Sequence, residues 1–143
     1  MRGFTLVELL VVLALMGLAL TLASPLIGNA LPGTEMRAAA RDVATGLRYA
    51  RSLAISSNSD VTFDVDVEAR RFQVSQSARN GGFPKDAEIT LTTARSELFG
   101  TGGGSIRFFP DGTSTGGGVE IVREKRRFVV TVDWLTGRVA ITP

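Results

Sequence analysis

The sequence predicts an α+β protein, in which one long N-terminal helix packs on an antiparallel β-sheet of about seven short strands. Three observations predict this class. A twenty-residue apolar run opens the chain, a helical repeat of apolar residues follows it, and from residue 58 onward apolar and polar residues alternate between turn signals. A helical region followed by a run of strands is typical of α+β folds.

The opening run extends from Phe4 to Ala23 and carries a single charge, Glu8. As a helix it is about 30 Å long, which matches the hydrocarbon core of a bilayer. We therefore expect residues 4–24 to form a transmembrane helix, with Arg2 on the cytoplasmic side. A carboxylate inside such a span must be neutralised or paired, so Glu8 is the first candidate functional residue.

A cationic partner for Glu8 is within reach if the chain is cut after Gly3. The new α-amine on Phe4 would then lie one helical turn before Glu8, and a neighbouring subunit could offer the same amine. A conventional secretory signal, cleaved near Ala23, and a plain signal anchor are the alternatives. A three-residue basic region and a charge within the apolar run argue against the secretory signal.

We expect the N-terminal helix to be kinked or irregular after the apolar run and to continue as a second helical segment. Pro25 and Pro32-Gly33 predict a kinked joint over residues 24–33. After it, an apolar stripe recurs at spacings of three and four, which predicts a helix laid on a sheet over the rest of residues 25–57. The stripe consists of Met36, Ala40, Val43, Leu47, Ala50 and Ala54.

Basic residues run beside this stripe within a narrow arc of the helix, and they are Arg37, Arg41, Arg48 and Arg51. They are either a solvated flank of a packed helix or a surface that contacts phospholipid head groups or acidic neighbours. The sequence leaves both interpretations open.

Residues 58–143 predict the antiparallel β domain, because the apolar period changes to two and turn signals separate the strands. The predicted strands cover Val61 to Asp66, Phe72 to Val74, Ile89 to Thr92, Ile106 to Phe108, Val119 to Val122, Phe128 to Val132 and Arg138 to Ile141. Glycine-rich stretches at residues 80–82, 102–104 and 116–118 are expected to be breaks or flexible loops.

The N-terminal segment from Gly3 to Glu8, followed by a Leu/Val-rich helix, resembles the class III signal of type IV pilins and type II secretion pseudopilins. The resemblance implies that residues 1–3 are a leader, that a prepilin peptidase cuts between Gly3 and Phe4, and that Phe4 is N-methylated. It also implies that Glu8 is the assembly residue, which pairs with the Phe4 amine of an adjacent subunit. A pilin fold, with the helix packed on the sheet, agrees with the class predicted above.

Three C-terminal elements resemble the H-type minor pseudopilins of type II secretion and their FimT-like minor pilin relatives. They are Phe108 to Gly112, Gly116 to Gly118 and Leu135 to Val139. The resemblance implies a structural subunit of the pseudopilus, anchored by a single pass in the bacterial inner membrane with residues 25–143 in the periplasm. It also implies five kinds of partner: other major and minor pseudopilins, the prepilin peptidase, the inner-membrane assembly platform, membrane lipid and secreted cargo.

The composition argues against most kinds of catalytic site, because the chain has no Cys and no His. The 16 basic and 14 acidic residues give a net charge of only +2, which does not indicate a particular binding partner. The glycine runs lack the Lys-Ser/Thr of a phosphate-binding loop, and the spacing of Asp64, Asp66, Asp111 and Asp133 is not that of a calcium loop. We expect no enzyme activity, no cofactor and no metal.

A second basic cluster keeps a DNA-binding alternative open, since FimT-like relatives include DNA-uptake pilins. Its members are Arg123, Lys125, Arg126 and Arg127, and a solvated hairpin tip explains them equally well. DNA-binding relatives carry a second Arg two residues after the Gly-Arg pair, where this chain has Ala140. The sequence therefore favours the secretion branch.

Overall fold

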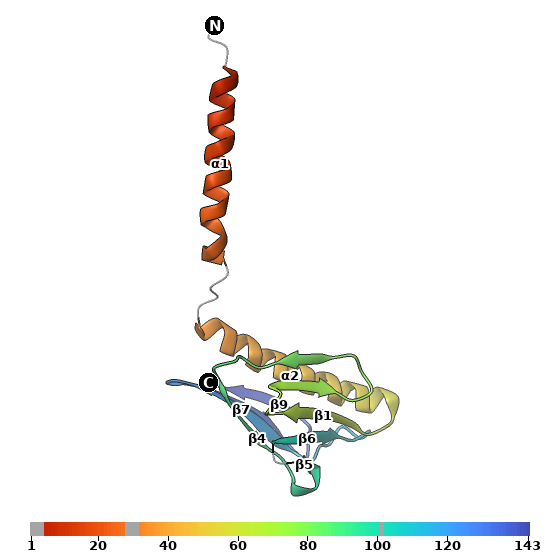
Figure 1. Cartoon of the computed structure of the whole chain (residues 1–143). Coiled ribbons are helices and arrows are strands. Elements are labelled where there is room, and N and C mark those ends of the chain that lie inside the picture. The colour runs from red at the N-terminus through yellow and green to blue at the C-terminus, as the bar shows by residue number, and fades with distance from the viewer. Residues whose placement is uncertain (1–4, 28–31, 101) are drawn as a thin grey trace. The chain divides into compact units, whose positions relative to one another are not determined.

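The computed structural model of the chain describes residues 5–27, 32–100 and 102–143, and it describes only the backbone at 20–27, 32 and 33. The chain divides into two compact units, Met1–Pro32 and Gly33–Pro143 (Figure 1). Helix α1 (Leu6–Ile27) lies in the first unit, and helix α2 (Pro32–Ser57) packs with the strands in the second. The predicted cleavage pair, Gly3 and Phe4, lies outside the described residues.

Helix α1 begins after Thr5, whose carbonyl and hydroxyl oxygens accept hydrogen bonds from the Glu8 N–H at 3.0 and 3.3 Å. This is the contact expected of a capping residue. The helix continues to Ile27, so the expectation that Pro25 interrupts it is wrong. A proline removes one N–H donor from a helix and does not always end it. Among the described residues, no helix combines the length and the apolar character needed to cross a membrane.

Helix α2 has the amphipathic pattern that the sequence predicts. All six residues of the predicted stripe are buried, with exposed fractions of 1% or less. Proline is tolerated in the first turn because the N–H it lacks has no partner there, and Pro32 is the first residue of the helix. The chain leaves the helix after Ser57 at Asn58, which has a positive φ of 50°.

The strands form two antiparallel sheets rather than the single predicted sheet. The first has the order β3-β2-β1-β6-β5 and the second the order β4-β7-β8-β9. The first contains β1 (Val61–Asp66), β2 (Arg71–Val74), β3 (Asn80–Gly82), β5 (Leu98–Phe99) and β6 (Gly103–Phe108). The second contains β4 (Glu88–Thr92), β7 (Gly117–Arg123), β8 (Arg126–Val132) and β9 (Val139–Thr142), and a short 3₁₀ turn, η1 (Arg95–Glu97), precedes β5.

All seven predicted strands are present, and the described residues add two short ones, β3 and β5. The predicted break at residues 80–82 is therefore wrong, since these residues pair with β2. The predicted loops are also wrong in part, because Gly103 and Gly104 lie in β6 and Gly117 and Gly118 lie in β7. At Gly118 a Cβ would lie 2.7 Å from the Val130 carbonyl oxygen, so glycine there permits close approach of a neighbouring strand.

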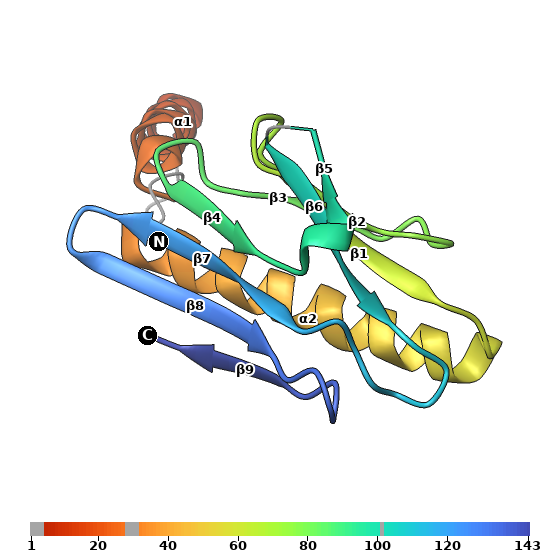
Figure 2. The ribbon, with the colours of Figure 1, turned by 90° about the horizontal axis from the view of Figure 1, so that it is seen from below.

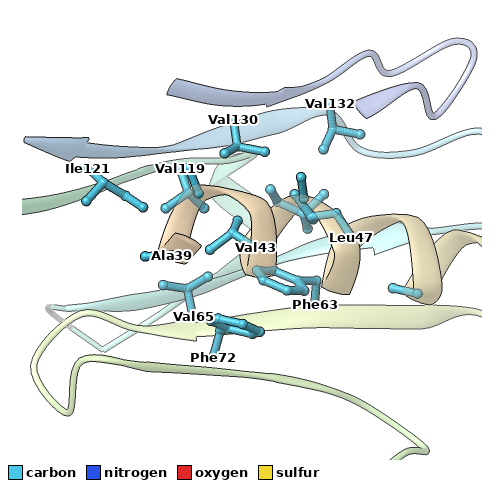
Figure 3. Packing of buried hydrophobic residues seen from close by; sticks show 14 of the residues in the cluster. Ala39, Val43, Leu47, Phe63, Val65, Phe72, Val119, Ile121, Val130 and Val132 are labelled. Carbon is cyan, nitrogen blue, oxygen red and sulfur yellow. The ribbon is translucent and has the colours of Figure 1, made fainter. Parts of the chain in front are cut away.

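Both sheets pack on the same side of α2, and Figure 2 shows their strands in front of that helix. Figure 3 shows the core they enclose, where Val43 and Leu47 of α2 meet side chains from both sheets. Phe63 and Phe72 of the first sheet stack with ring centroids 5.0 Å apart. The second sheet contributes Val119, Ile121, Val130 and Val132. The other side of α2 carries the exposed residues considered below.

Candidate functional site

The predicted assembly residue, Glu8, lies in the first turn of α1, where its side chain is exposed. A carboxylate at a helix N-terminus is favoured by the partial positive charge of the unpaired N–H groups. Within residues 5–27, 32–100 and 102–143 the Glu8 carboxylate makes no ion pair with a basic side chain. It is therefore accessible to a partner, whereas the cleavage pair Gly3-Phe4 lies outside the described residues.

The four arginines of α2 fall into two pairs. Arg48 donates to the Val139 carbonyl oxygen at 3.3 Å, and Arg51 donates from Nε to the Gly112 carbonyl oxygen at 3.0 Å. Arg37 and Arg41 instead line an open groove of about 330 Å³ beside Phe128 and Ile141. The guanidinium groups of this second pair make no ion pair within the described part of the chain, so it is the pair available for an external anion.

The second basic cluster does not form one surface. Arg123 bridges Glu35 at 3.3 Å and Asp86 at 3.2 Å, and Arg127 pairs with Glu120 at 2.5 Å. Lys125 and Arg126 remain exposed at the tip of the β7–β8 hairpin. The hairpin turn forms as the sequence predicts, with Glu124 at a positive φ of 56°. The positive charge that could face a nucleic acid is thus reduced to these two side chains.

A mixed-charge groove beside the start of α2 was not found by sequence reasoning. It has a volume of about 520 Å³ and lies between α2 and the loop that follows β3. Its charged residues are Glu35, Asp42, Lys85, Asp86 and Arg123. Of the three carboxylates that line this groove, Glu35 and Asp86 pair with Arg123, whereas Asp42 makes no ion pair with a basic side chain in the described residues. The seven-residue spacing of Glu35 and Asp42, which puts both on one side of a helix, is the signal that could have revealed it.

Two of the three C-terminal motifs, Phe108 to Gly112 and Leu135 to Val139, lie side by side, and Arg51 of α2 lies beside both. The turn at Pro110 to Gly112 ends in a hydrogen bond from the Gly112 N–H to the Phe109 carbonyl oxygen at 2.9 Å. The Ser114 N–H donates to the Trp134 carbonyl oxygen at 2.8 Å, which connects this turn to the next. At Gly137 a Cβ would collide with the Gly112 carbonyl oxygen and lie 2.7 Å from Arg51 Nε.

Two aspartates hold these turns through hydrogen bonds to nearby threonines. Asp111 Oδ1 accepts from the Thr113 hydroxyl at 2.7 Å and from its N–H at 2.9 Å, and these bonds lower the pKa of Asp111. Asp133 Oδ1 accepts from the Thr136 hydroxyl at 2.7 Å and from its N–H at 2.8 Å, and the pKa of Asp133 is lowered in the same way. Both carboxylates therefore have a structural role.

Among the described residues, no group of three or more His, Cys, Asp or Glu side chains is placed to hold a metal ion. Arg107 makes two hydrogen bonds of 3.1 Å to the Glu97 carboxylate. These bonds raise the pKa of the guanidinium. That pair connects η1 to β6, so its role is also structural.

Comparison with known proteins identifies the family. Residues 39–136 match the family described as Type II transport protein GspH, and residues 1–24 match the prokaryotic N-terminal methylation motif. The chain is also 35% identical, over all 143 of its residues and 84% of the relative, to Type II secretion system protein H of Xanthomonas campestris pv. campestris. The chain belongs to the GspH family.

Two solved structures of pilin-like proteins have a fold similar to that of this chain. The type IV minor pilin FimU of Pseudomonas aeruginosa matches with a TM-score of 0.59 and 18% identity, over 77% of this chain and 90% of FimU. The minor pseudopilin EpsH from the Type 2 Secretion System of Vibrio cholerae matches with a TM-score of 0.59 and 14% identity, over 76% of this chain and 96% of EpsH. The predicted pilin-like α+β fold is confirmed.

The methylation motif and the GspH family together imply a membrane-anchored protein with a periplasmic domain. Membership also implies association with other pseudopilins. The family match begins at Ala39 and ends at Thr136, so it includes Arg51, Gly112 and most of the turn that contains Gly137. Two of the C-terminal motifs, Phe108 to Gly112 and Leu135 to Val139, lie beside Arg51 of α2.

Proposed function

We propose that this chain is a structural minor pseudopilin, which joins the periplasmic pseudopilus of a type II secretion system and aids the export of folded proteins across the outer membrane. Similarity to Type II secretion system protein H along the whole chain carries the proposal. The proposed role is assembly and not catalysis. The fold, a long amphipathic helix covered on one side by two sheets, fits a subunit whose other side meets neighbours.

Residues 1–3 act as the leader in this proposal, and a prepilin peptidase cuts between Gly3 and Phe4 and methylates Phe4. Residues 4–24 span the inner membrane, residues 25–57 form the periplasmic half of the helical region, and residues 58–143 form the periplasmic β domain. The match of residues 1–24 to the N-terminal methylation motif supports this assignment. The inner-membrane assembly platform, membrane lipid and secreted cargo complete the set of partners.

Glu8 guides assembly by pairing with the Phe4 amine of an adjacent subunit. Its exposure in the first turn of α1 supports this role. Burial of a carboxylate in a lipid environment is unfavourable unless a cation neutralises it. Pairing of Glu8 with the Phe4 amine of the adjacent subunit would therefore stabilise each added subunit. The pairing would draw subunits into the fibre one at a time.

Deletion of the gene tests the function. We expect folded secreted enzymes to accumulate in the periplasm of the deletion strain and the wild-type chain to restore export. Glu8→Gln should insert in the membrane normally but restore little export, because the amide cannot pair ionically with the Phe4 amine. Glu68→Gln, at an exposed carboxylate of the β1–β2 turn, is the matched control and should behave as wild type. Normal export from the deletion strain would refute the proposal.

A minor pilin that binds DNA during natural transformation is the alternative. The equal TM-scores with FimU and EpsH and the exposed Lys125 and Arg126 are the observations in its favour. Each phosphate contact should contribute about 0.9 to the slope of log affinity against log salt for duplex DNA. A mobility-shift series across salt concentrations that showed steep, salt-sensitive binding would support this alternative, and absence of binding would remove it.

A further inference from the structure

The groove beside the first turns of α2 combines positive charge with apolar surface. Arg37 and Arg41 line it from the helix, and Phe128 and Ile141 line it from β8 and β9. Because the two arginines are four residues apart, their side chains are neighbours on one face of the helix. Both are exposed, and neither guanidinium has a carboxylate partner in the described part of the chain. The groove therefore offers two unpaired cations next to apolar side chains that are only partly buried.

Arg126 adds a third positive charge on the same side of the domain. It lies opposite Arg123 in the register of β7 and β8, and opposed residues of an antiparallel pair project from the same face. Since Arg123 reaches Glu35 of α2 at 3.3 Å, that face is the one toward α2. Arg126 is exposed and makes no ion pair among the described residues. Figure 2 shows its hairpin beside the N-terminal end of α2.

The length of the chain limits how far these three arginines, which we call the basic end (Arg37, Arg41 and Arg126), can lie from α1. Only residues 28–31 separate Ile27 from Pro32, so the Cα atoms of those two residues are at most about 18 Å apart. This limit holds for any placement of the two units. Along the axis of α2, Arg37 and Arg41 follow Pro32 by about 8 and 14 Å, whereas the other end of the helix lies about 38 Å beyond it.

We propose that the basic end binds the phosphate of an anionic phospholipid in the membrane that holds α1, with Arg37 and Arg41 as the main contacts. This inference rests on the proposed function, in which α1 spans that membrane. A guanidinium matches a phosphate through two parallel hydrogen bonds, and Phe128 and Ile141 offer apolar surface to the rest of the lipid. The attraction of basic side chains to anionic lipid falls off within about 8 Å at physiological ionic strength. The contact therefore holds the domain on the head groups until the subunit enters the fibre.

The full-length chain in lipid nanodiscs tests this contact. Thr45→Cys carries a fluorophore, because the sequence has no other cysteine and Thr45 is exposed one turn beyond Arg41. Two kinds of disc contain the same fraction of a lipid with a nitroxide on its head group. One kind is otherwise phosphatidylcholine, and the other also contains phosphatidylglycerol. We expect the nitroxide to quench the fluorophore at least about threefold more strongly in the anionic discs.

Variants locate the contact. Arg37→Gln with Arg41→Gln should reduce quenching in the anionic discs to the level in phosphatidylcholine discs, and Arg126→Gln should reduce it in part. Arg95→Gln with Arg138→Gln is the matched control, because it removes the same charge from two exposed arginines outside the basic end, and it should leave quenching unchanged. Inorganic phosphate, compared with chloride at equal ionic strength, should also leave quenching unchanged, since the lipid phosphate stays at a high effective concentration.

Three outcomes would overturn the proposal. Equal quenching in the two kinds of disc would leave the basic end to an acidic neighbouring subunit. An equal loss in the control variant would indicate general charge attraction, and a loss caused by inorganic phosphate would indicate a site for the free anion. Recovery of the chain with the discs is measured separately. A chain that does not enter them would refute the membrane anchor of the proposed function as well, whereas a chain that enters and shows equal quenching would refute only this inference.

Discussion

Gly137 is the residue at which the two C-terminal turns and α2 come closest. It has a positive φ of 62°, and a Cβ there would meet the Gly112 carbonyl oxygen and the Arg51 side chain. A left-handed conformation costs an L-residue about 1–2 kcal/mol before any collision is counted. Glycine is thus required at this position both for its backbone conformation and for space.

Gly137→Ala should therefore lower the free energy of unfolding by about 3 kcal/mol or more, measured by urea unfolding of the detergent-solubilised chain. Gly100→Ala is the matched control, because Gly100 has a φ of 64° but no atom within 4 Å of the Cβ position. The control should lose only about 1–2 kcal/mol. Equal losses in the two variants would show that the close approach at Gly137 does not matter.

Asp133 should make the stability of the fold depend on pH under acidic conditions. Its pKa is lowered chiefly by the Thr136 hydroxyl, so the ionised carboxylate is favoured in the folded chain. The resulting stabilisation is fully present above the unfolded pKa of about 3.9 and is lost as the pH falls through the lower folded value. Unfolding curves collected between neutral pH and about pH 2 should show a shallower loss of stability for Asp133→Asn than for wild type. An identical pH dependence would contradict this assignment.

Helix α2 is held against the first sheet at Gly46. A Cβ at this position would lie 2.7 Å from Cε2 of Phe63 and 3.3 Å from Cε2 of Phe72. Phe63 is fully buried and Phe72 nearly so, so neither ring can move away easily. The glycine therefore sets the distance between the helix and the two stacked rings.

Gly46→Ala should be destabilising even though alanine is the better helix former. The substitution gains about 1 kcal/mol of helix propensity but overpacks a close-packed core, which typically costs about 1–3 kcal/mol. We expect a net loss of roughly 1 kcal/mol, measured by the urea midpoint. Ser52→Ala, on the exposed surface of the same helix, should be neutral or slightly stabilising. A more stable Gly46→Ala variant would refute the packing argument.

The elements that the sequence predicted are those with strong apolar periodicity. The α2 stripe and the seven alternating strands are all present. The missed strand β3 has the sequence Asn-Gly-Gly, which carries no such signal. It forms because Gly81 pairs with Phe72 and leaves room for its ring, with 2.7 Å between the Gly81 Cβ position and Phe72 Cε1. Pairing of this kind depends on tertiary neighbours, which local periodicity does not encode.

At the scale of the whole molecule, the sequence predicted which residues are charged but not which of them are paired. Arg123 was grouped with its hairpin neighbours, yet its partners Glu35 and Asp86 come from distant parts of the chain. Arg51 was grouped with the helix arginines, and it binds the Gly112 carbonyl oxygen. Contacts at such sequence separation are set by the fold, so only the structure reveals that Arg37 and Arg41 have no carboxylate partner among the described residues.

The proposed function requires a chain that is processed at its N-terminus and assembled through a membrane helix. Mass spectrometry of the mature protein, purified from the membranes of its own host, tests this most directly. We predict a chain that begins at Phe4 with a methylated α-amine, and a chain that retains residues 1–3 in a strain without the prepilin peptidase. A mature N-terminus at Met1, or one created by cleavage after Ala23, would contradict the proposed processing and assembly.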